Sequence, residues 1–111
     1  MNKAFAYIRP RARTSLTRQR RALARYALRN GLEITKWFLE MDRSAYKSRP
    51  DFRRMLKDLR SGKAMGIISD NLERFSRNLR EWAEVSILIS QRNIELHFAD
   101  DARRCKALIK Y

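Results

Sequence analysis

Short apolar runs alternate along this chain with segments in which apolar side chains recur at helical spacing. Four runs predict strands, at Lys3 to Arg9, Leu32 to Leu39, Ala64 to Ser69 and Ile94 to Phe98, and the first of them is expected to be buried. Three segments predict helices, from Ser15 to Asn30, from Ser48 to Gly62 and from Asn78 to about Arg92, and a last helix is expected over Ala102 to Tyr111.

The first predicted helix has two contrasting faces. Leu16, Leu23 and Ala27 share one face. The opposite face carries four arginines at steps of three or four residues: Arg18, Arg21, Arg25 and Arg29. Ser15 is expected to cap this helix and Gly31 to end it. This helix therefore packs with one side and presents a row of positive charge with the other.

The alternation of strands and helices is typical of right-handed βαβ units. It predicts an α/β fold with a mostly parallel sheet of four to five strands and helices on both faces. The second helix would cover the sheet with Phe52, Met55, Leu56 and Leu59, and the third with Trp82, Val85, Leu88 and Ile89. We expect residues 1–111 to form a single domain.

The charge balance narrows the class of partner. The chain has 26 Lys and Arg against 12 Asp and Glu, a net charge of +14. The excess is mostly arginine, whose planar guanidinium can grip a phosphate with two hydrogen bonds. We therefore expect nucleic acid, with DNA favoured, as the partner. A solvated basic surface and an acidic protein partner are the alternatives.

The sequence also argues against several other classes of protein. No segment resembles a signal peptide or a membrane span, so no membrane partner is expected. Cys105 is the only cysteine and His97 the only histidine, so neither a disulfide, a metal site nor another cofactor is expected. His97 is expected to have a packing or surface role. This usage fits the reducing cytoplasm.

Ligands of open α/β sheets bind beyond the carboxyl ends of the strands. Charged residues follow each predicted strand at that edge. The residues that we expect to form a phosphate site at this edge are Arg9, Arg11, Arg49, Glu73, Arg74 and Arg77. Such a cluster suits a phosphodiester, although these arginines could instead pair with neighbouring acids. Glu40 to Ser48 is expected to be a polar loop.

Four motifs in order resemble the serine recombinases of the resolvase/invertase family. They are Tyr7-Ile8-Arg9, the segment from Ser15 to Leu23 with Gln19, the segment from Arg49 to Lys63, and Leu72-Glu73-Arg74-Phe75-Ser76-Arg77. The resemblance extends from about Lys3 to about Asp101. It implies a metal-free enzyme in which a serine attacks a DNA phosphate that several arginines hold.

The resemblance places Arg9, Arg49, Arg74 and Arg77 at the family's arginine positions, with Glu73 in place of an aspartate. It also places Arg11 where the nucleophilic serine belongs. Arginine stays protonated and cannot form the covalent intermediate, so no catalytic residue is expected. Ser44-Ala45 departs from the family's Ser-Gly. We also expect the family's long dimer helix and its helix-turn-helix DNA reader to be absent, although a homodimer through other surfaces stays open.

Three functions remain open at this point. The first is an inactive nucleic-acid-binding protein with an accessory or regulatory role, which would hold phosphates with little base reading. The second is a protein that binds and modulates an intact recombinase or another DNA enzyme, as would suit a phage or mobile element. The third is an active recombinase or nuclease with a relocated nucleophile such as Ser15.

Overall fold

A computed structural model of the chain describes residues 2–9, 13–40, 50–70 and 79–99, with side chains for all of these except 13–15 and 79–82. The described elements follow one another as β1 (Asn2–Ile8), α1 (Arg13–Arg29), β2 (Leu32–Leu39), α2 (Pro50–Arg60), β3 (Gly66–Ser69), α4 (Leu79–Arg92) and β4 (Glu95–Phe98). Each predicted strand and each of the first three predicted helices is present, with ends shifted by up to two residues. The helix expected over Ala102 to Tyr111 lies outside the described residues.

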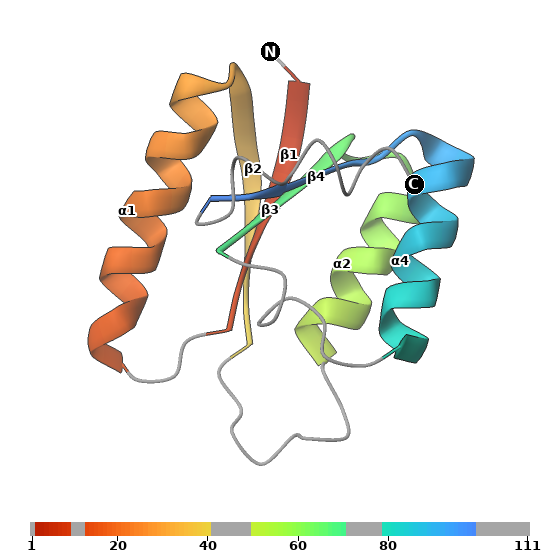
Figure 1. The fold of residues 1–111 in the computed structure, drawn as a ribbon, viewed down its shortest axis with the longest axis horizontal. Helices are drawn as coiled ribbons and strands as arrows, with labels where there is room; N and C mark the ends of the chain where they lie inside the picture. Colours follow the sequence, from red (N-terminus) through yellow and green to blue (C-terminus); the bar gives the residue numbers. More distant parts are fainter. Residues whose placement is uncertain (1, 10–12, 41–49, 71–78, 100–111) are drawn as a thin grey trace.

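The four strands form one sheet in the order β2-β1-β3-β4, and every neighbouring pair is parallel. Helix α1 covers one face of this sheet, and α2 and α4 cover the other (Figure 1). The predicted α/β fold, with a parallel sheet between helices, is confirmed.

Strand β1 shows how the two faces are built. Successive side chains of a strand point to opposite faces, so Ala4, Ala6 and Ile8 pack toward α1 with Leu23 and Ala27. The small alanines let α1 lie close to the sheet.

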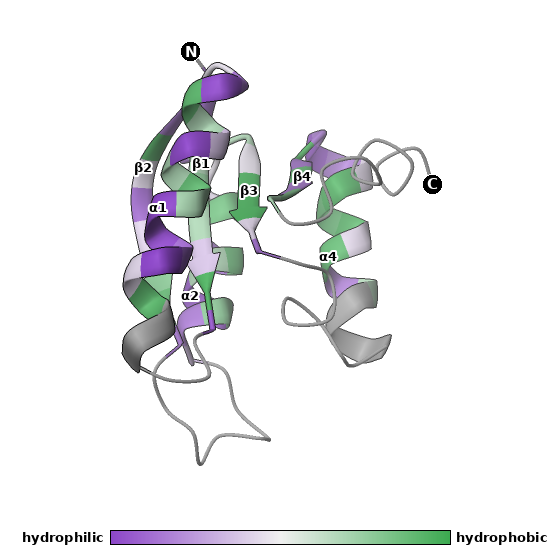
Figure 2. Cartoon of the chain, turned by 60° about the vertical axis from the view of Figure 1, so that its left-hand side comes forward, coloured by the Kyte–Doolittle hydropathy of each residue, from purple (hydrophilic) through white to green (hydrophobic). Residues whose placement is uncertain are grey.

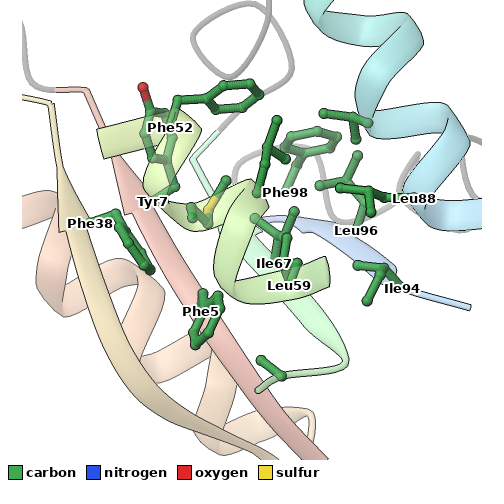
Figure 3. Close-up of a cluster of buried hydrophobic side chains, with 14 residues drawn as sticks. Phe5, Tyr7, Phe38, Phe52, Leu59, Ile67, Leu88, Ile94, Leu96 and Phe98 are labelled. Atoms are coloured by element: carbon green, nitrogen blue, oxygen red, sulfur yellow. The ribbon is translucent and has the colours of Figure 1, made fainter. Parts of the chain in front are cut away.

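The larger core lies on the other face. Phe5 and Tyr7 of β1 join buried side chains of α2 and α4 there, and Figure 3 shows this cluster between the sheet and the two helices. The rings of Tyr7 and Phe52 meet edge-on at 5.5 Å between centroids. The four residues predicted for the inner face of α2 are all buried: Phe52, Met55, Leu56 and Leu59. The sequence periodicity therefore identified the core-facing side of α2.

The ends of the helices agree with the glycine signals, with one correction. Gly31 and Gly62 have φ of 66° and 77°, the left-handed conformation that ends a helix at little cost for glycine. The expected cap at Ser15 is wrong, because α1 begins at Arg13 and Ser15 lies inside its first turn. The chain turns into the helix two residues earlier than its polar cap signal indicated.

In the part of the chain that the structure describes, no helix combines the length and the apolar character that crossing a membrane requires.

Candidate nucleic-acid interface

The carboxyl ends of the four parallel strands lie at one edge of the sheet. Ile8 of β1 pairs with Leu39 of β2, and Ser69 of β3 pairs with Phe98 of β4. The residues that come next, Arg9, Glu40, Asp70 and Ala99, therefore leave the sheet at the same edge. Open α/β sheets bind their ligands at this edge.

Of the six residues predicted for the phosphate site, only Arg9 belongs to the described part of the chain. Arg9 directly follows β1, is half-buried, and has no hydrogen bond or ion pair to another described residue. The other five lie outside the described residues: Arg11, Arg49, Glu73, Arg74 and Arg77. Their convergence with Arg9 stays a prediction.

Glu40 connects three elements at this edge. The residue is only 3% exposed, although the sequence suggested that it begins a polar loop. Its Oε2 accepts a hydrogen bond from the Tyr7 hydroxyl at 3.3 Å and one from the backbone N–H of Phe52 at 3.1 Å. Phe52 lies in the first turn of α2, where backbone N–H groups without helical partners favour a negative charge. Glu40 therefore positions α2 against β1 and β2.

Asp70 and Gln19 form a second buried connection. Asp70 is 4% exposed and Gln19 is 8% exposed. The Gln19 amide donates a hydrogen bond to Asp70 at 3.3 Å, which ties α1 to the end of β3. The Ser69 hydroxyl contacts the other carboxylate oxygen and donates to the backbone carbonyl of Tyr7 at 3.0 Å. These contacts fix the edge beside Arg9.

Two features of the sequence point to buried polar contacts of Glu40 and Asp70. Neither feature belongs to the hydrophobic periodicity that predicts the helices and strands. Gln19 occupies the core-facing line of α1, three residues after Leu16 and four before Leu23, where a polar side chain needs a buried partner. Glu40 directly follows strand β2, and Asp70 directly follows the buried strand β3. Neither signal names the partner, because these hydrogen bonds join residues distant in sequence.

The row of arginines on α1 is exposed as its spacing predicts. Arg18, Arg21, Arg25 and Arg29 are exposed, whereas Leu23 beneath them is fully buried. Hydrophilic bands recur along α1 in Figure 2. A shallow surface hollow of about 370 Å³ runs along this side of the helix, and its described lining consists of Thr17, Arg18, Arg21, Ala22 and Arg25.

The charge of α1 is unbalanced. The helix has six arginines and no acidic residue in 17 positions. None of the four row arginines has an ion pair with another described residue, and neighbours in the row repel one another by about 0.2–0.5 kcal/mol per pair. Arg20, on the β2 side, instead lies over the Trp37 ring, 5.1 Å from its centroid. An anion bound along the row would reduce this repulsion.

A polar chain holds the other flank of α1 to strand β4. The Tyr26 hydroxyl lies 2.7 Å from Nδ1 of His97, and Nε2 of His97 lies 2.9 Å from Glu95. A carboxylate only accepts, so Nε2 carries a proton, and in the neutral ring Nδ1 accepts from Tyr26. His97 thus has a packing role that sets the position of α1. Among the described residues, no three His, Cys, Asp or Glu side chains gather closely enough to hold a metal ion.

Comparison with known proteins agrees with this fold. Residues 4–108 match the family described as "Resolvase, N terminal domain". The chain therefore belongs to the resolvase family of serine recombinases, as its motifs suggested. No protein of curated function matches the chain significantly in sequence.

Solved structures share the architecture at low sequence identity. A resolvase family site-specific recombinase from Streptococcus pneumoniae superposes with a TM-score of 0.80 at 23% identity, over 99% of this chain and 82% of that one. The N-terminal catalytic domain of TP901-1 integrase gives 0.78 at 18% identity, over 97% and 88%. The C-terminal catalytic domain of ISC1926 TnpA, an IS607-like serine recombinase, gives 0.73 at 17% identity, over 96% and 75%. At these identities the likeness concerns the fold.

Proposed function

We propose that this chain is a non-catalytic member of the resolvase family that binds nucleic-acid phosphates through arginine side chains, in an accessory or regulatory role. The observation that carries the proposal is the outer face of α1. Its four arginines are exposed and repel one another, and no acidic residue of the helix compensates them. A polyanion would turn this unfavourable arrangement into a favourable one.

The sheet edge supplies a second part of the proposed binding surface. The Gln19–Asp70 hydrogen bond fixes α1 relative to the end of β3. Arg9 leaves the sheet at that same edge. We propose that Arg11, Arg49, Arg74 and Arg77 add further phosphate contacts there, with Glu73 orienting neighbouring arginines.

The proposed absence of catalysis rests on the residue at position 11. Formation of a phosphodiester link to the protein requires a nucleophile that can lose a proton, and a guanidinium stays protonated in proteins. By its place in the family's first motif, Arg11 replaces the attacking serine. The replacement adds a cation that can grip phosphate and removes the group that would cut the strand.

Fluorescence anisotropy with a labelled random-sequence DNA duplex, measured over a series of salt concentrations, tests this function. We expect tight binding at low salt and a slope of log K against log salt of about −0.9 for each phosphate contacted. Weak binding at low salt would contradict the proposal. Retention of an intact recombinase at high salt, with weak DNA binding, would favour the protein-modulating alternative.

A further inference from the structure

Helix α1 is placed where a long partner could reach most of its surface. In the described part of the chain it is the only helix on its face of the sheet (Figure 1). Its inner line packs on the strands through Leu23 and Ala27. The outer side of the helix is exposed from Arg18 to Arg29, except for the side chains that border the inner line. This stretch is about 16 Å long, at a rise of roughly 1.5 Å per residue.

The outer side also carries an apolar side chain that no core residue covers. Leu28 is 76% exposed, more than the other exposed large hydrophobic residues among those that the structure describes, Ile87 at 55% and Met65 at 47%. On the helix surface it neighbours Arg25, three residues earlier, and Ala24, four residues earlier. Ala24 is exposed too and is small enough to let a partner approach the helix backbone. Leu28 thus adds apolar surface beside the arginines.

This combination of side chains matches the edges of base pairs as well as the phosphates. Arginine is the residue that most often reads guanine, through O6 and N7 in the major groove, and apolar side chains contact the thymine methyl group there. The major groove of B-form DNA is about 12 Å wide, and a helix with its side chains is about 10–12 Å across. The size and chemistry of the outer side of α1 therefore fit that groove.

We infer that α1 enters the major groove of B-form duplex DNA, with Arg21 and Arg25 directed at base edges, Leu28 at a thymine methyl group, and Arg18 and Arg29 at the flanking phosphates. The inference rests on the proposed nucleic-acid function and adds the groove and the type of duplex. It differs from the expectation of little base reading. Double-stranded RNA does not permit this mode of binding, because the A-form major groove is too deep and narrow for a helix.

Two duplexes of identical sequence, one DNA and one RNA, separate this inference from the function on which it rests. At one fixed salt concentration we expect DNA to bind at least about tenfold more tightly, because the A-form major groove does not admit a helix. Equal affinities with a steep salt dependence would overturn groove insertion and leave phosphate binding intact. Weak binding to both duplexes would overturn the proposed function itself.

Substitutions that preserve charge test the base contacts. Arg21→Lys keeps the charge but loses the paired hydrogen bonds, so we expect affinity for a guanine-containing site to fall about fivefold or more, with the salt slope unchanged. The site is first obtained by selection from random duplexes. Arg53→Lys on α2, where Arg53 is also exposed, is the matched control and should bind as wild type. An unchanged affinity for Arg21→Lys and Arg25→Lys would contradict base reading.

The thymine contact has its own test. Replacing thymidine by deoxyuridine in the duplex removes only the methyl group of the base and leaves the base pair intact. We expect this replacement to weaken binding of the wild type severalfold and to leave the Leu28→Ala variant unaffected. Circular dichroism confirms that the variant is folded. Equal losses in the two proteins would show that Leu28 does not contact the methyl group.

Discussion

The side-chain amide of Gln19 donates a hydrogen bond to the carboxylate of Asp70 at 3.3 Å and so joins helix α1 to the end of strand β3. Both residues are buried. The helix that carries the arginine row is thereby fixed to the sheet edge where Arg9 leaves β1.

Replacing Gln19 should therefore destabilise the fold. Gln19→Ala removes a hydrogen bond to a buried carboxylate and leaves a cavity, so we expect the free energy of unfolding to fall by about 1–3 kcal/mol. Urea unfolding followed by circular dichroism measures this loss. Gln91→Ala, at an exposed position of α4, is the control and should change the free energy by less than about 0.5 kcal/mol. Equal stabilities of the two variants would show that the Gln19 contact does not hold α1.

Glu40 is expected to be more sensitive to a change of shape than to a change of charge. Glu40→Gln keeps an oxygen that can accept from both Tyr7 and Phe52, whereas Glu40→Leu removes the acceptor of both hydrogen bonds. We expect Glu40→Leu to cost about 2 kcal/mol or more in the free energy of unfolding and Glu40→Gln clearly less. Urea unfolding of both variants measures the difference. A double-mutant cycle with Tyr7→Phe separates the hydroxyl contact.

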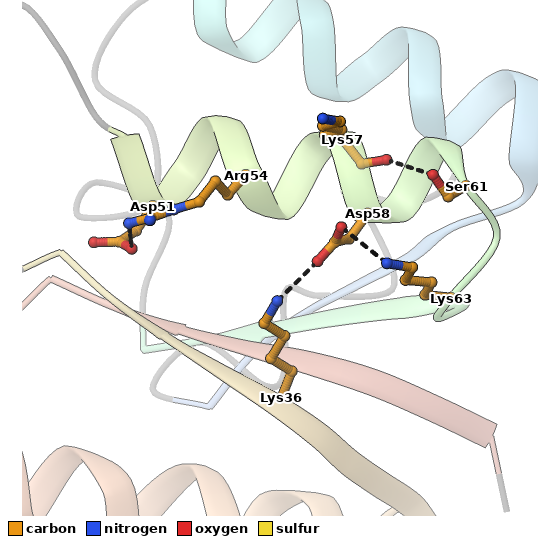
Figure 4. Close-up of polar contacts among 7 residues, drawn as sticks. All are labelled: Lys36, Asp51, Arg54, Lys57, Asp58, Ser61 and Lys63. Carbon is orange, nitrogen blue, oxygen red and sulfur yellow. Dashed lines mark hydrogen bonds and ion pairs between the residues drawn. The ribbon is translucent and has the colours of Figure 1, made fainter.

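The pH dependence of stability should report on Asp58. Lys36 donates a hydrogen bond to it at 3.0 Å, and Lys63 lies 3.5 Å from its other oxygen (Figure 4). The hydrogen bond from Lys36, with the charges of Lys36 and Lys63, lowers the pKa of Asp58 below its ordinary value of 3.8.

Because the folded pKa is the lower one, the unfolded chain binds more protons in the interval between the two values, and stability rises with pH there. The contribution of Asp58 is therefore complete above pH 3.8 and is lost as the pH falls through the lowered pKa. We expect Asp58→Asn to be less stable than wild type at pH 7 and to approach it as the pH falls below 3.8. Thermal unfolding over this range measures the difference, with exposed Glu84→Gln as the control. A difference that does not change with pH would contradict the contact.

If the protein is non-catalytic, as proposed, the wild type forms no covalent adduct with supercoiled DNA. Denaturing gels of protein incubated with labelled plasmid test this. The Arg11→Ser variant should bind duplex DNA more weakly than wild type. Its salt slope should become shallower by about one unit for the lost phosphate contact. An adduct that forms with wild type and disappears in Ser15→Ala would instead establish a relocated nucleophile.

Periodicity predicted most of the fold. The arginine row and the opposite apolar line of α1 follow from a repeat of three or four residues, and parallel strands follow from their alternation with helices. Glycines 31 and 62 marked two helix ends, whereas the left-handed Asn93 after α4 was not predicted. The start of α1 was misplaced because Ser15 is a plausible cap that the structure does not use.

The buried polar contacts could not be predicted in the same way. Tyr7 and Glu40 lie 33 residues apart, and Gln19 and Asp70 lie 51 apart. Spacing within one helix or strand says nothing about which distant side chain completes a hydrogen bond. The sequence identified polar residues at the sheet edge and on the core line of α1, and only the three-dimensional arrangement pairs them.

The measurement that tests the central claim most directly compares two proteins with the same net charge. One replaces Arg18, Arg21, Arg25 and Arg29 of α1 with glutamine, and the other replaces four exposed cations elsewhere: Arg53, Lys57, Arg60 and Arg92. If α1 contacts DNA as proposed, the first protein should lose about two units of salt slope on duplex DNA, for the phosphates at Arg18 and Arg29, and most of its affinity, while the second stays close to wild type. Equal losses in both would mean that binding depends only on net charge, and the proposed interface would be wrong.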